Sequence, residues 1–522
     1  MKKRIKSDVL IIGSGLAGTS AALALAQSGL KILIVSRENN PSESNTEKAQ
    51  GGIITIGPDD SPALLFQDIM RAGAGLCHPK AVEILVDQGP KIVKEILVKE
   101  IKVPFSKAGG KIHYTLEAAH SKPRILHVGD TTGRAIEEKI IKKLKSFSNI
   151  KFLTNHTAID LLTIPHHSKN PLAVYDDIIC LGAYILNRKT NQIQTVFSRK
   201  TVLATGGAGQ VFLHTTNFPG ARGDGLAMAH RAGAQIINLE YIQFHPTTFY
   251  HRDAKRFLIS ETVRGEGGKL ETRDGKMFMY KYDKREDLAP RDVVARAIYS
   301  EMISRKEDYV LLNLASYLPA TKIKKRFPNI YKTCLSFGFD ITKKPIPVVP
   351  AAHYFCGGIK VDEWGQSNIK NLYAVGEVSC TGIHGANRLA ANALLECLTW
   401  GWRSGEHIIQ NIEDGWSFKF SEIYDWHDRG LTEEIDPALI SQDWLTIKNT
   451  MWNYVSLIRT QKRLERAKAD LEYLKHRIDN FYQETKLTDD LIGLRNTLQV
   501  ALMIIYAGLA NRQSRGCHWR AS

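Results

Sequence analysis

Apolar runs and glycine-rich turns alternate over the first fifty residues of the chain. Val9–Ile12 is an unbroken apolar run, glycines follow at positions 13, 15 and 18, and an Ala/Leu-rich stretch comes next. A second apolar run covers Ile32–Val35. This order predicts a strand, a glycine turn, a helix and a second strand, which together form a βαβ unit. The glycine turn and the helix N-terminus of such a unit hold phosphate groups.

Later changes of pattern divide the rest of the chain. β-type runs return near residues 170–205 and end at Gly206 and Gly207, whereas a mixture of charged loops and helical stretches follows. Residues 357–378 predict a hairpin and then a strand that ends at Glu377. Helical periodicity dominates the last hundred residues. We therefore predict three parts: an α/β Rossmann-like nucleotide-binding domain (1–237 and 350–415), an inserted α+β domain (238–349) and a C-terminal helical bundle (416–522).

Composition narrows the class of protein. With 522 residues, 43% of them hydrophobic and 24% charged, the chain is expected to fold into several globular domains. It has no uninterrupted apolar stretch of about 18 residues, so no membrane span is predicted. The basic N-terminus runs into the glycine motif without a cleavage site, which favours a cytoplasmic location. The seven cysteines form no C-x-x-C pair, so neither a disulfide framework nor a metal site is expected.

The formal net charge of +16 has more than one interpretation. The lysines and arginines are spread out, which is typical of solvated helix faces, and we expect no nucleic-acid partner. An RNA-binding protein is nevertheless a rival interpretation of this charge. The positive field would also attract an anionic substrate.

The dinucleotide is indicated by segments outside the first motif. The acidic residue that would hold an NAD ribose is missing, because Ser36 and Arg37 stand at the end of the second predicted strand. Gly51 and Gly52 let the backbone lie against a planar ring, and the Glu377 carboxylate can hold sugar-like hydroxyls. The helix predicted from about residue 390 would aim its positive N-terminus at an anionic ring. These features together favour FAD.

A series of ordered motifs carries a family resemblance over nearly the whole chain. They include "GSGLAG", "AQGG", "ATGGAGQVF", "QFHPT", "LAPRDVVARAI", "PAAHYFCGGI", "LYAVGEV" and "HGANRLAANALLE". The chain resembles the succinate dehydrogenase/fumarate reductase flavoprotein superfamily, and within it most closely the L-aspartate oxidase family. The resemblance implies that the inserted domain caps an FAD site.

The resemblance also implies which residues bind FAD and how. They are Gly13, Ser14, Gly15, Leu16, Ala17, Gly18, Arg37, Asn45, Thr46, Glu47, Lys48, Ala49, Gln50, Gly51, Gly52, Asp224, Glu377, Ala393 and Leu394. Respiratory members carry a histidine, covalently bonded to FAD, where this chain has Asn45, so we expect noncovalent FAD. The stretch "LEAAHSKPRILHVGDTTG" with Glu117 is similar to the aspartate-oxidising branch. A flavoprotein subunit of fumarate reductase or succinate dehydrogenase is the alternative.

The candidate substrate residues match the charges of an amino-dicarboxylate. Arg388 can make a bidentate contact to a carboxylate. His245, His353, Ser260 and Gln243 are expected to complete the two carboxylate sites. Each could instead be structural, and a lone His245 is typical of a protein core.

The remaining two candidates have roles that the resemblance implies. Arg291 corresponds to the proton-transfer residue of fumarate reduction, and we expect a mainly electrostatic role in aspartate oxidation. Glu117 is expected to pair with the substrate ammonium. Either residue could be structural, Arg291 as a helix cap and Glu117 as a surface charge. His120, Arg124 and His127 could line the entrance or stabilise their loop.

The implied reaction is the oxidation of L-aspartate to iminoaspartate. The amine must lose a proton before hydride can leave Cα for flavin N5, because a developing cation beside –NH3+ is unfavourable. Oxygen or fumarate would reoxidise the flavin, and the product would feed quinolinate synthase in NAD biosynthesis. Family members continue past the "SRGCHWRAS" segment, so the packing of the last helix is an open question.

Overall fold

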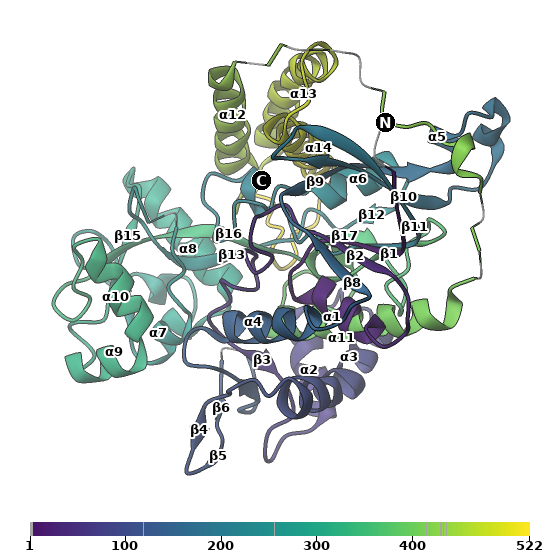
Figure 1. Ribbon diagram of the computed structural model, residues 1–522. Helices are drawn as coiled ribbons and strands as arrows, with labels where there is room; N and C mark the ends of the chain where they lie inside the picture. The colour runs from purple at the N-terminus through teal and green to yellow at the C-terminus, as the bar shows by residue number, and fades with distance from the viewer. Residues whose placement is uncertain are drawn as a thin grey trace.

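The computed structural model describes residues 4–521 except 118, 255, 414, 417, 428–430, 432 and 435. Its largest sheet has seven strands, six of them in the order β8-β2-β1-β11-β10-β9, and β18 pairs with the end of β11 (Figure 1). The bounds are β1 Arg4–Ile12, β2 Ile32–Val35, β8 Ile150–Leu153, β9 His156–Thr163, β10 Cys180–Asn187, β11 Gln192–Leu203 and β18 Leu372–Ala374. β1, β2, β8, β11 and β18 are parallel, whereas β10 and β9 add antiparallel strands.

Helices cover this sheet on the side of the first βαβ unit. The predicted helix after the glycines is α1, Leu16–Leu25, and it packs against α11, Asn392–Asn411. The other helices of this part are α2 Pro62–Ala72, α3 Pro79–Ile92, the π-helix η1 Val93–Glu100, α4 Thr132–Leu144, α5 Ile164–His167 and α6 Asp224–Arg231. α1 and α11 pack together although more than 350 positions separate them in the sequence.

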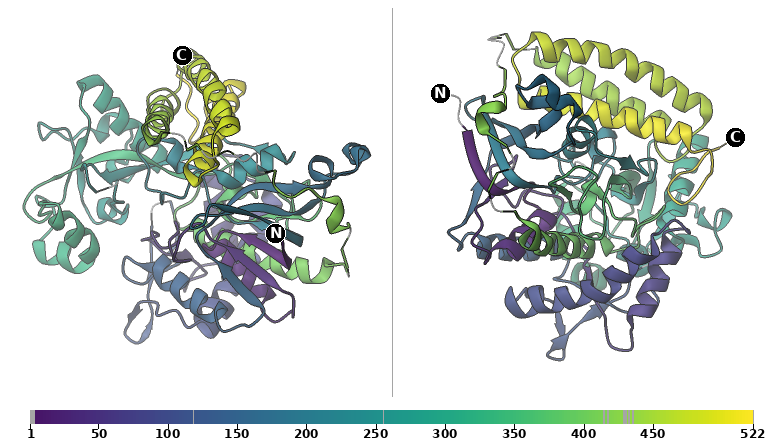
Figure 2. Two further views of the ribbon diagram at one scale, coloured as in Figure 1. Left: turned by 45° about the horizontal axis from the view of Figure 1, so that its top comes forward. Right: turned by 90° about the vertical axis from the view of Figure 1, so that its right-hand side faces the viewer.

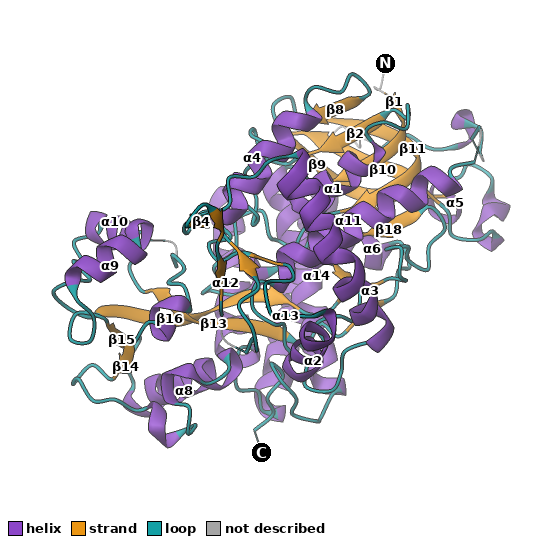
Figure 3. Cartoon of the chain, turned by 90° about the horizontal axis from the view of Figure 1, so that it is seen from below, coloured by secondary structure: helices purple, strands orange, loops and turns teal. Residues whose placement is uncertain are grey.

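A second, antiparallel sheet lies beside the first, as the view from below shows (Figure 3). Its order is β13-β16-β15-β14, with bounds β13 Ile242–Phe249, β14 Lys269–Glu271, β15 Val310–Asn313 and β16 Ile346–Phe355. Its helices are α7 Thr262–Gly265, α8 Arg291–Arg305, α9 Ala320–Arg326 and α10 Pro328–Ser336. These elements fall largely within the predicted inserted domain.

Several short strands make three small sheets. β12 (Ile236–Ile237), β17 (Gly358–Lys360) and β19 (Ser379–Cys380) form one of them. β3 (Ile53–Ile54), β7 (Ile125–Leu126) and β6 (Tyr114–Thr115) form another, and β4 (Lys107–Ala108) pairs with β5 (Lys111–Ile112). The hairpin expected in residues 357–378 is wrong, because β17 pairs with β12 and β19 whereas β18 joins β11.

Three long helices end the chain and run side by side (Figure 2). They are α12 Pro437–Val455, α13 Gln461–Glu484 and α14 Asp489–Ala510, so the helices begin about twenty residues after the expected start at 416. Part of the segment before them packs on the large sheet, where the Phe418 and Phe420 rings contact Phe197. α14 is long and apolar enough to cross a membrane, but 72% of its apolar window is buried inside the protein, as in a core helix. The expected fold class is confirmed.

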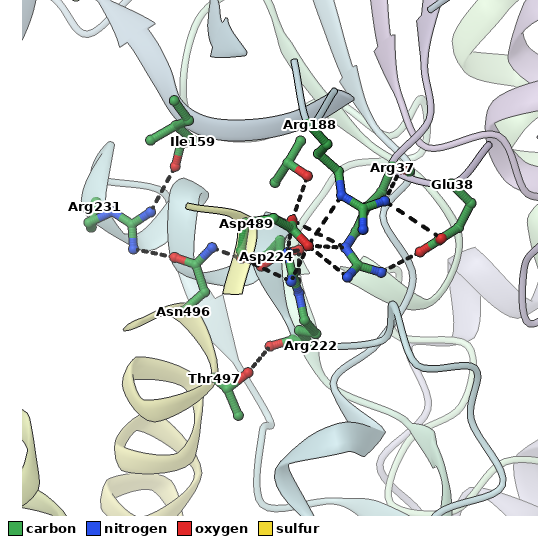
Figure 4. Close-up of polar contacts among 11 residues, drawn as sticks. Arg37, Glu38, Ile159, Arg188, Arg222, Asp224, Arg231, Asp489, Asn496 and Thr497 are labelled. Atoms are coloured by element: carbon green, nitrogen blue, oxygen red, sulfur yellow. Dashed lines mark hydrogen bonds and ion pairs between the residues drawn. The ribbon is translucent and has the colours of Figure 1, made fainter. Parts of the chain in front are cut away.

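An ionic network ties α14 to the nucleotide-binding part (Figure 4). Asp489, at the start of α14, pairs with Arg37 at 2.8 Å, Arg222 at 3.2 Å and Arg188 at 3.3 Å. Arg222 is almost fully buried and also pairs with Asp224 at 2.9 Å. The residues come from β2, β11, α6 and α14 or the loops beside them, so one carboxylate joins segments that are far apart in sequence.

Candidate active site

A cavity of about 880 Å³ lies where the two main sheets and α11 meet. Most of the predicted site residues line it: Asn45, Thr46, Glu47, Lys48, Ala49, Gln50, Gly51, Gly52, Glu117, His245, Ser260, Arg291, His353, Glu377, Arg388, Ala393 and Leu394. Gly13, Ser14, Gly15, Leu16, Ala17, Gly18, Arg37, Asp224 and Gln243 are outside its lining. The size and the convergence of polar groups are typical of a ligand site.

The glycine turn before α1 has the geometry of a phosphate loop. Gly13 has a φ of +115°, and a Cβ on Gly18 would come within 2.1 Å of the Gly13 oxygen. The helix therefore starts directly against the strand, with the backbone amides of its first turn facing the end of the sheet. The Thr46 hydroxyl accepts one of them, from Leu16, at 3.1 Å.

Two predicted cofactor residues are engaged in the ionic network instead of lining the cavity. The Arg37 guanidinium bonds to Asp489 and Glu38, and the Asp224 carboxylate bonds to Arg222 and Asn496. Both lie near the end of the large sheet beside the glycine turn, so their contact with a nucleotide stays a prediction.

Glu377 lies beside the glycine turn Gly206–Gly207, which follows β11. Its carboxylate accepts the Phe355 backbone N–H at 3.0 Å and lies against Gly207, where a Cβ would be 2.3 Å from it. Burial raises the pKa of Glu377 to about 7, although the Phe355 N–H opposes the shift. A buried carboxylate of this kind needs hydroxyl or N–H donors, which a sugar-like chain supplies.

The residues around the cavity fit FAD. The Gln50 side-chain oxygen and the Arg388 Nε are buried without a hydrogen-bond partner in the described part of the chain. The Asn392 amide is likewise unpartnered at the start of α11, next to cavity residues Ala391 and Ala393. Unpartnered buried polar atoms are rare in folded proteins and indicate a missing ligand. A phosphate loop, a carboxylate and these free groups match the three parts of a flavin dinucleotide.

Two arginines meet on the amide oxygen of Gln243. Arg388 Nη2 donates to it at 3.1 Å and Arg291 Nη1 at 3.3 Å. The Gln243 amide nitrogen donates to the Arg388 carbonyl oxygen at 2.8 Å and to Asn387 Oδ1 at 2.7 Å. Because both ends of this fully buried amide are occupied, Gln243 lies behind the arginines and orients them.

The C-terminal segment contacts Asn387, which also accepts a hydrogen bond from Gln243. The Cys517 thiol donates to Asn387 Oδ1 at 3.1 Å, and the Cys517 backbone N–H donates to the Ala386 oxygen at 3.0 Å. Arg459 contacts His518 Nδ1 at 2.6 Å, and His518 is fully buried. The segment after α14 thus packs against Ala386 and Asn387, the two residues before Arg388.

A carboxylate that the sequence analysis did not assign holds Arg291. Glu261 accepts from Arg291 Nε at 2.6 Å and from Arg264 Nη2 at 3.3 Å. Burial alone would raise the pKa of Glu261, but the two arginines lower it overall. The sequence carries one signal of this pairing, because Glu261 and Arg264 stand three positions apart. Arg388 forms no ion pair with the residues that the structure describes, and burial together with Arg291 lowers its pKa.

The two predicted histidines lie side by side. Their ring centroids are 5.3 Å apart at 64°. His353 Nδ1 bonds to the Thr216 hydroxyl at 2.8 Å, and His245 Nδ1 contacts the Thr247 backbone, which leaves each Nε2 for a ligand. Burial and the nearby arginines hold the pKa of His245 well below its usual value, and burial and His245 do the same for His353.

Glu117 lies against the loop that contains Gly51 and Gly52. A Cβ on Gly51 would come within 2.8 Å of its Oε1. Burial raises the pKa of Glu117, an effect that Arg291 opposes. Within the described residues its carboxylate has no hydrogen bond or ion pair, so the surface-charge interpretation of Glu117 does not fit its position in the cavity.

Buried ion pairs hold the loop that carries Glu117. Arg124 is 0% exposed and pairs with Asp60 at 2.8 Å and Asp68 at 2.9 Å. His120 contacts the Ala390 oxygen at 3.0 Å. Of the two roles considered for these loop residues, the structure supports stabilisation, because none of them lines the cavity.

Comparison with known proteins decides the family. A family model described as an FAD binding domain matches residues 8–394, and one described as the fumarate reductase flavoprotein C-terminus matches residues 445–522. L-aspartate oxidase 1 of Ralstonia nicotianae is 42% identical over 516 residues, which cover 98% of this chain and 94% of that protein. L-aspartate oxidase of Pseudomonas aeruginosa is 41% identical, over 99% of this chain and 96% of that protein. The chain belongs to the L-aspartate oxidase family.

Solved structures place this L-aspartate oxidase family member within the expected superfamily. The FrdA chain of E. coli quinol fumarate reductase is 27% identical with a TM-score of 0.88, and the alignment covers 100% of this chain and 92% of that chain. A chain of the Mycobacterium smegmatis Sdh1 complex is 29% identical with a TM-score of 0.81, over 99% and 89%. FAD as the cofactor is confirmed. The higher identity to L-aspartate oxidases makes the fumarate reductase alternative the weaker reading.

Proposed function

We propose that this protein oxidises L-aspartate to iminoaspartate with noncovalently held FAD. The observation that carries the proposal is the unpaired Glu117 carboxylate in a cavity that also holds two guanidinium groups. A dicarboxylate with one ammonium presents the complementary charges. Desolvating these charges costs less when each one meets its counterpart.

The substrate carboxylates are assigned to the cationic and hydrogen-bonding side of the cavity. Arg388 binds one carboxylate, because its guanidinium forms no ion pair with a described carboxylate and can attract an anion. The Nε2 atoms of His245 and His353 and the Ser260 hydroxyl donate to the substrate carboxylates. Arg291 is paired with Glu261. It stabilises the negative charge of the substrate carboxylates near the reacting carbon, but binds them less strongly than Arg388 does.

Glu117 is assigned to the substrate nitrogen. Its carboxylate accepts from the ammonium and selects aspartate over succinate. The amine must lose a proton before the C–H bond breaks, and the raised pKa of Glu117 suits this carboxylate to hold that proton. Bound FAD would accept the hydride that leaves Cα, and with it the two electrons of the oxidation. Positioning of the two reacting atoms would account for much of the rate.

The wider role follows from the family and stays a proposal. We place the enzyme in the cytoplasm, with oxygen or fumarate reoxidising the flavin and with iminoaspartate passing to quinolinate synthase for NAD biosynthesis. Acid precipitation tests the noncovalent attachment, because FAD should stay in the supernatant. Yellow colour in the pellet would contradict the role given to Asn45.

The substitution Glu117→Gln tests the ammonium assignment. It keeps the shape of the side chain but removes the charge, and a hydrogen bond to a charged group is worth about 2 kcal/mol, or roughly 30-fold. We expect kcat/KM for L-aspartate to fall by about that factor, with fumarate reduction changed less than threefold. Glu138→Gln, on the exposed side of α4, is the control. An equal loss of both activities would remove Glu117 from this role.

A further inference from the structure

Three cations that lie outside the predicted FAD-binding segments line one part of the cavity, which we call its mouth. Arg252 and Arg256 come from the loop after β13, and Lys448 comes from α12. The mouth therefore joins the inserted part of the chain to the C-terminal helices. It belongs to the same cavity as Arg291 and Arg388.

Side-chain contacts connect Arg256 to the helix that carries Lys448. Arg256 Nε donates to His214 Nδ1 at 2.9 Å. The His214 ring packs on Trp452, with centroids 4.4 Å apart, and Trp452 lies one helical turn from Lys448. Lys448 Nζ donates to Gln210 Oε1 at 3.3 Å.

No carboxylate balances these cations within the described residues. Arg256 is half-buried and stacks on the Tyr250 ring at 4.7 Å, and burial lowers its pKa. Burial also lowers the pKa of Lys448. Arg252 is exposed and unpaired in the described structure. Cations withdrawn from water without a counterion favour the binding of an anion.

A cofactor phosphate is a poor candidate for that anion. The phosphate loop expected to hold the FAD pyrophosphate is Gly13–Gly18, and none of its residues lines this cavity. The three cations of the mouth instead line the cavity that contains Arg388.

We infer that Arg252, Arg256 and Lys448 form an outer carboxylate-binding subsite, where a dicarboxylate docks by one carboxylate before it moves inward. The identity of the dicarboxylate rests on the proposed function. The subsite increases the rate of capture and leaves the chemical step unchanged, because its residues do not touch the reacting atoms. Clefts lined by one sign of charge raise association rates in this way.

The test compares wild-type holoenzyme with a Arg252→Gln/Arg256→Gln/Lys448→Gln variant. Flavin reduction by L-aspartate is followed anaerobically by stopped flow at low and moderate sodium chloride. We expect the second-order rate constant at low salt to fall about tenfold, with a weaker salt dependence and an unchanged limiting rate. The control variant Lys142→Gln/Lys325→Gln/Lys462→Gln carries the same charge change on exposed surfaces and should stay within twofold of wild type.

A second readout separates this inference from the proposed function. Inorganic phosphate should quench tryptophan fluorescence saturably, because Lys448 lies 5.4 Å from the Trp444 ring centroid. The quenching should be lost in the mouth variant and kept in the control variant. Wild-type flavin that L-aspartate does not reduce would defeat the proposed function, whereas phosphate quenching would still support the subsite. Mouth and control variants that behave alike in both assays would overturn the subsite.

Discussion

Asp489 is predicted to contribute strongly to the attachment of the C-terminal helices. Its carboxylate pairs with Arg37, Arg188 and Arg222 and accepts the Thr157 hydroxyl at 2.6 Å. With Glu38 and Asp224, three carboxylates balance three guanidinium groups in this network. Asp489→Asn would leave one positive charge without a counterion beside Arg222, which is only 3% exposed.

The magnitude follows from the burial of the partners. Removing one member of a buried ion pair costs about 3–5 kcal/mol. The side chains of Arg37 and Arg188 are 22% and 28% exposed, so water screens part of the loss. We therefore expect Asp489→Asn to lower the free energy of unfolding by about 3 kcal/mol, at the lower end of that range.

Chemical denaturation followed by circular dichroism and tryptophan fluorescence measures this loss. Because a chain of several domains does not unfold in one step, the comparison uses the transition that includes α12–α14. Asp490→Asn is the matched control, since Asp490 is the next residue in the same helical turn, exposed and without an ion pair in the described structure. It should change stability by less than about 0.5 kcal/mol. Equal stabilities of the two variants would refute the reasoning.

The stability difference between wild type and Asp489→Asn should change with pH in one direction. Burial would raise the pKa of Asp489, but Arg222 and Arg37 hold it well below its usual value. A carboxylate with a depressed folded-state pKa stabilises the protein above its unfolded-state pKa, which is about 4. The stability difference between wild type and Asp489→Asn should therefore be full at neutral pH and shrink as the pH falls below about 4.

Three further predictions concern the site. Arg388→Leu should keep its yellow flavin but lose dicarboxylate turnover by roughly 1,000-fold in steady-state kinetics, because a buried charge partner is removed; normal saturation kinetics would exclude Arg388 from the substrate site. Asn387→Ala should raise KM for aspartate and fumarate alike by about tenfold at unchanged FAD content, because Gln243 loses one of the two acceptors that orient it; an unchanged KM would show that this bond is dispensable. Burial raises the pKa of Glu117, so KM for L-aspartate, but not for fumarate, should rise as the pH falls toward a value above the usual carboxylate range; superimposable pH profiles would contradict the pairing.

Local patterns predicted the βαβ start and the helical C-terminus because each depends on residues close together in sequence. The hairpin at residues 357–378 failed for the opposite reason. β17 finds its partners in β12 and β19, and β18 finds its partner in β11, so tertiary packing outweighed the local turn signal.

In the candidate site, too, the sequence identified some residues, whereas the role of others depends on tertiary packing. Motif resemblance picked Arg291, Arg388 and the two histidines, which share one cavity. It did not assign Glu261, because its partners Arg291 and Arg264 reveal its role only in three dimensions. The orienting position of Gln243, behind the arginines, was hidden for the same reason.

The central claim is that one cavity presents a flavin to an amino-dicarboxylate. Anaerobic mixing of the purified yellow protein with L-aspartate, D-aspartate, L-glutamate or succinate, followed at the flavin absorbance band, tests it most directly. The account predicts rapid and complete bleaching by L-aspartate and slow or no bleaching by the other three compounds. Flavin that stays oxidised in excess L-aspartate, or that succinate bleaches equally fast, would contradict it.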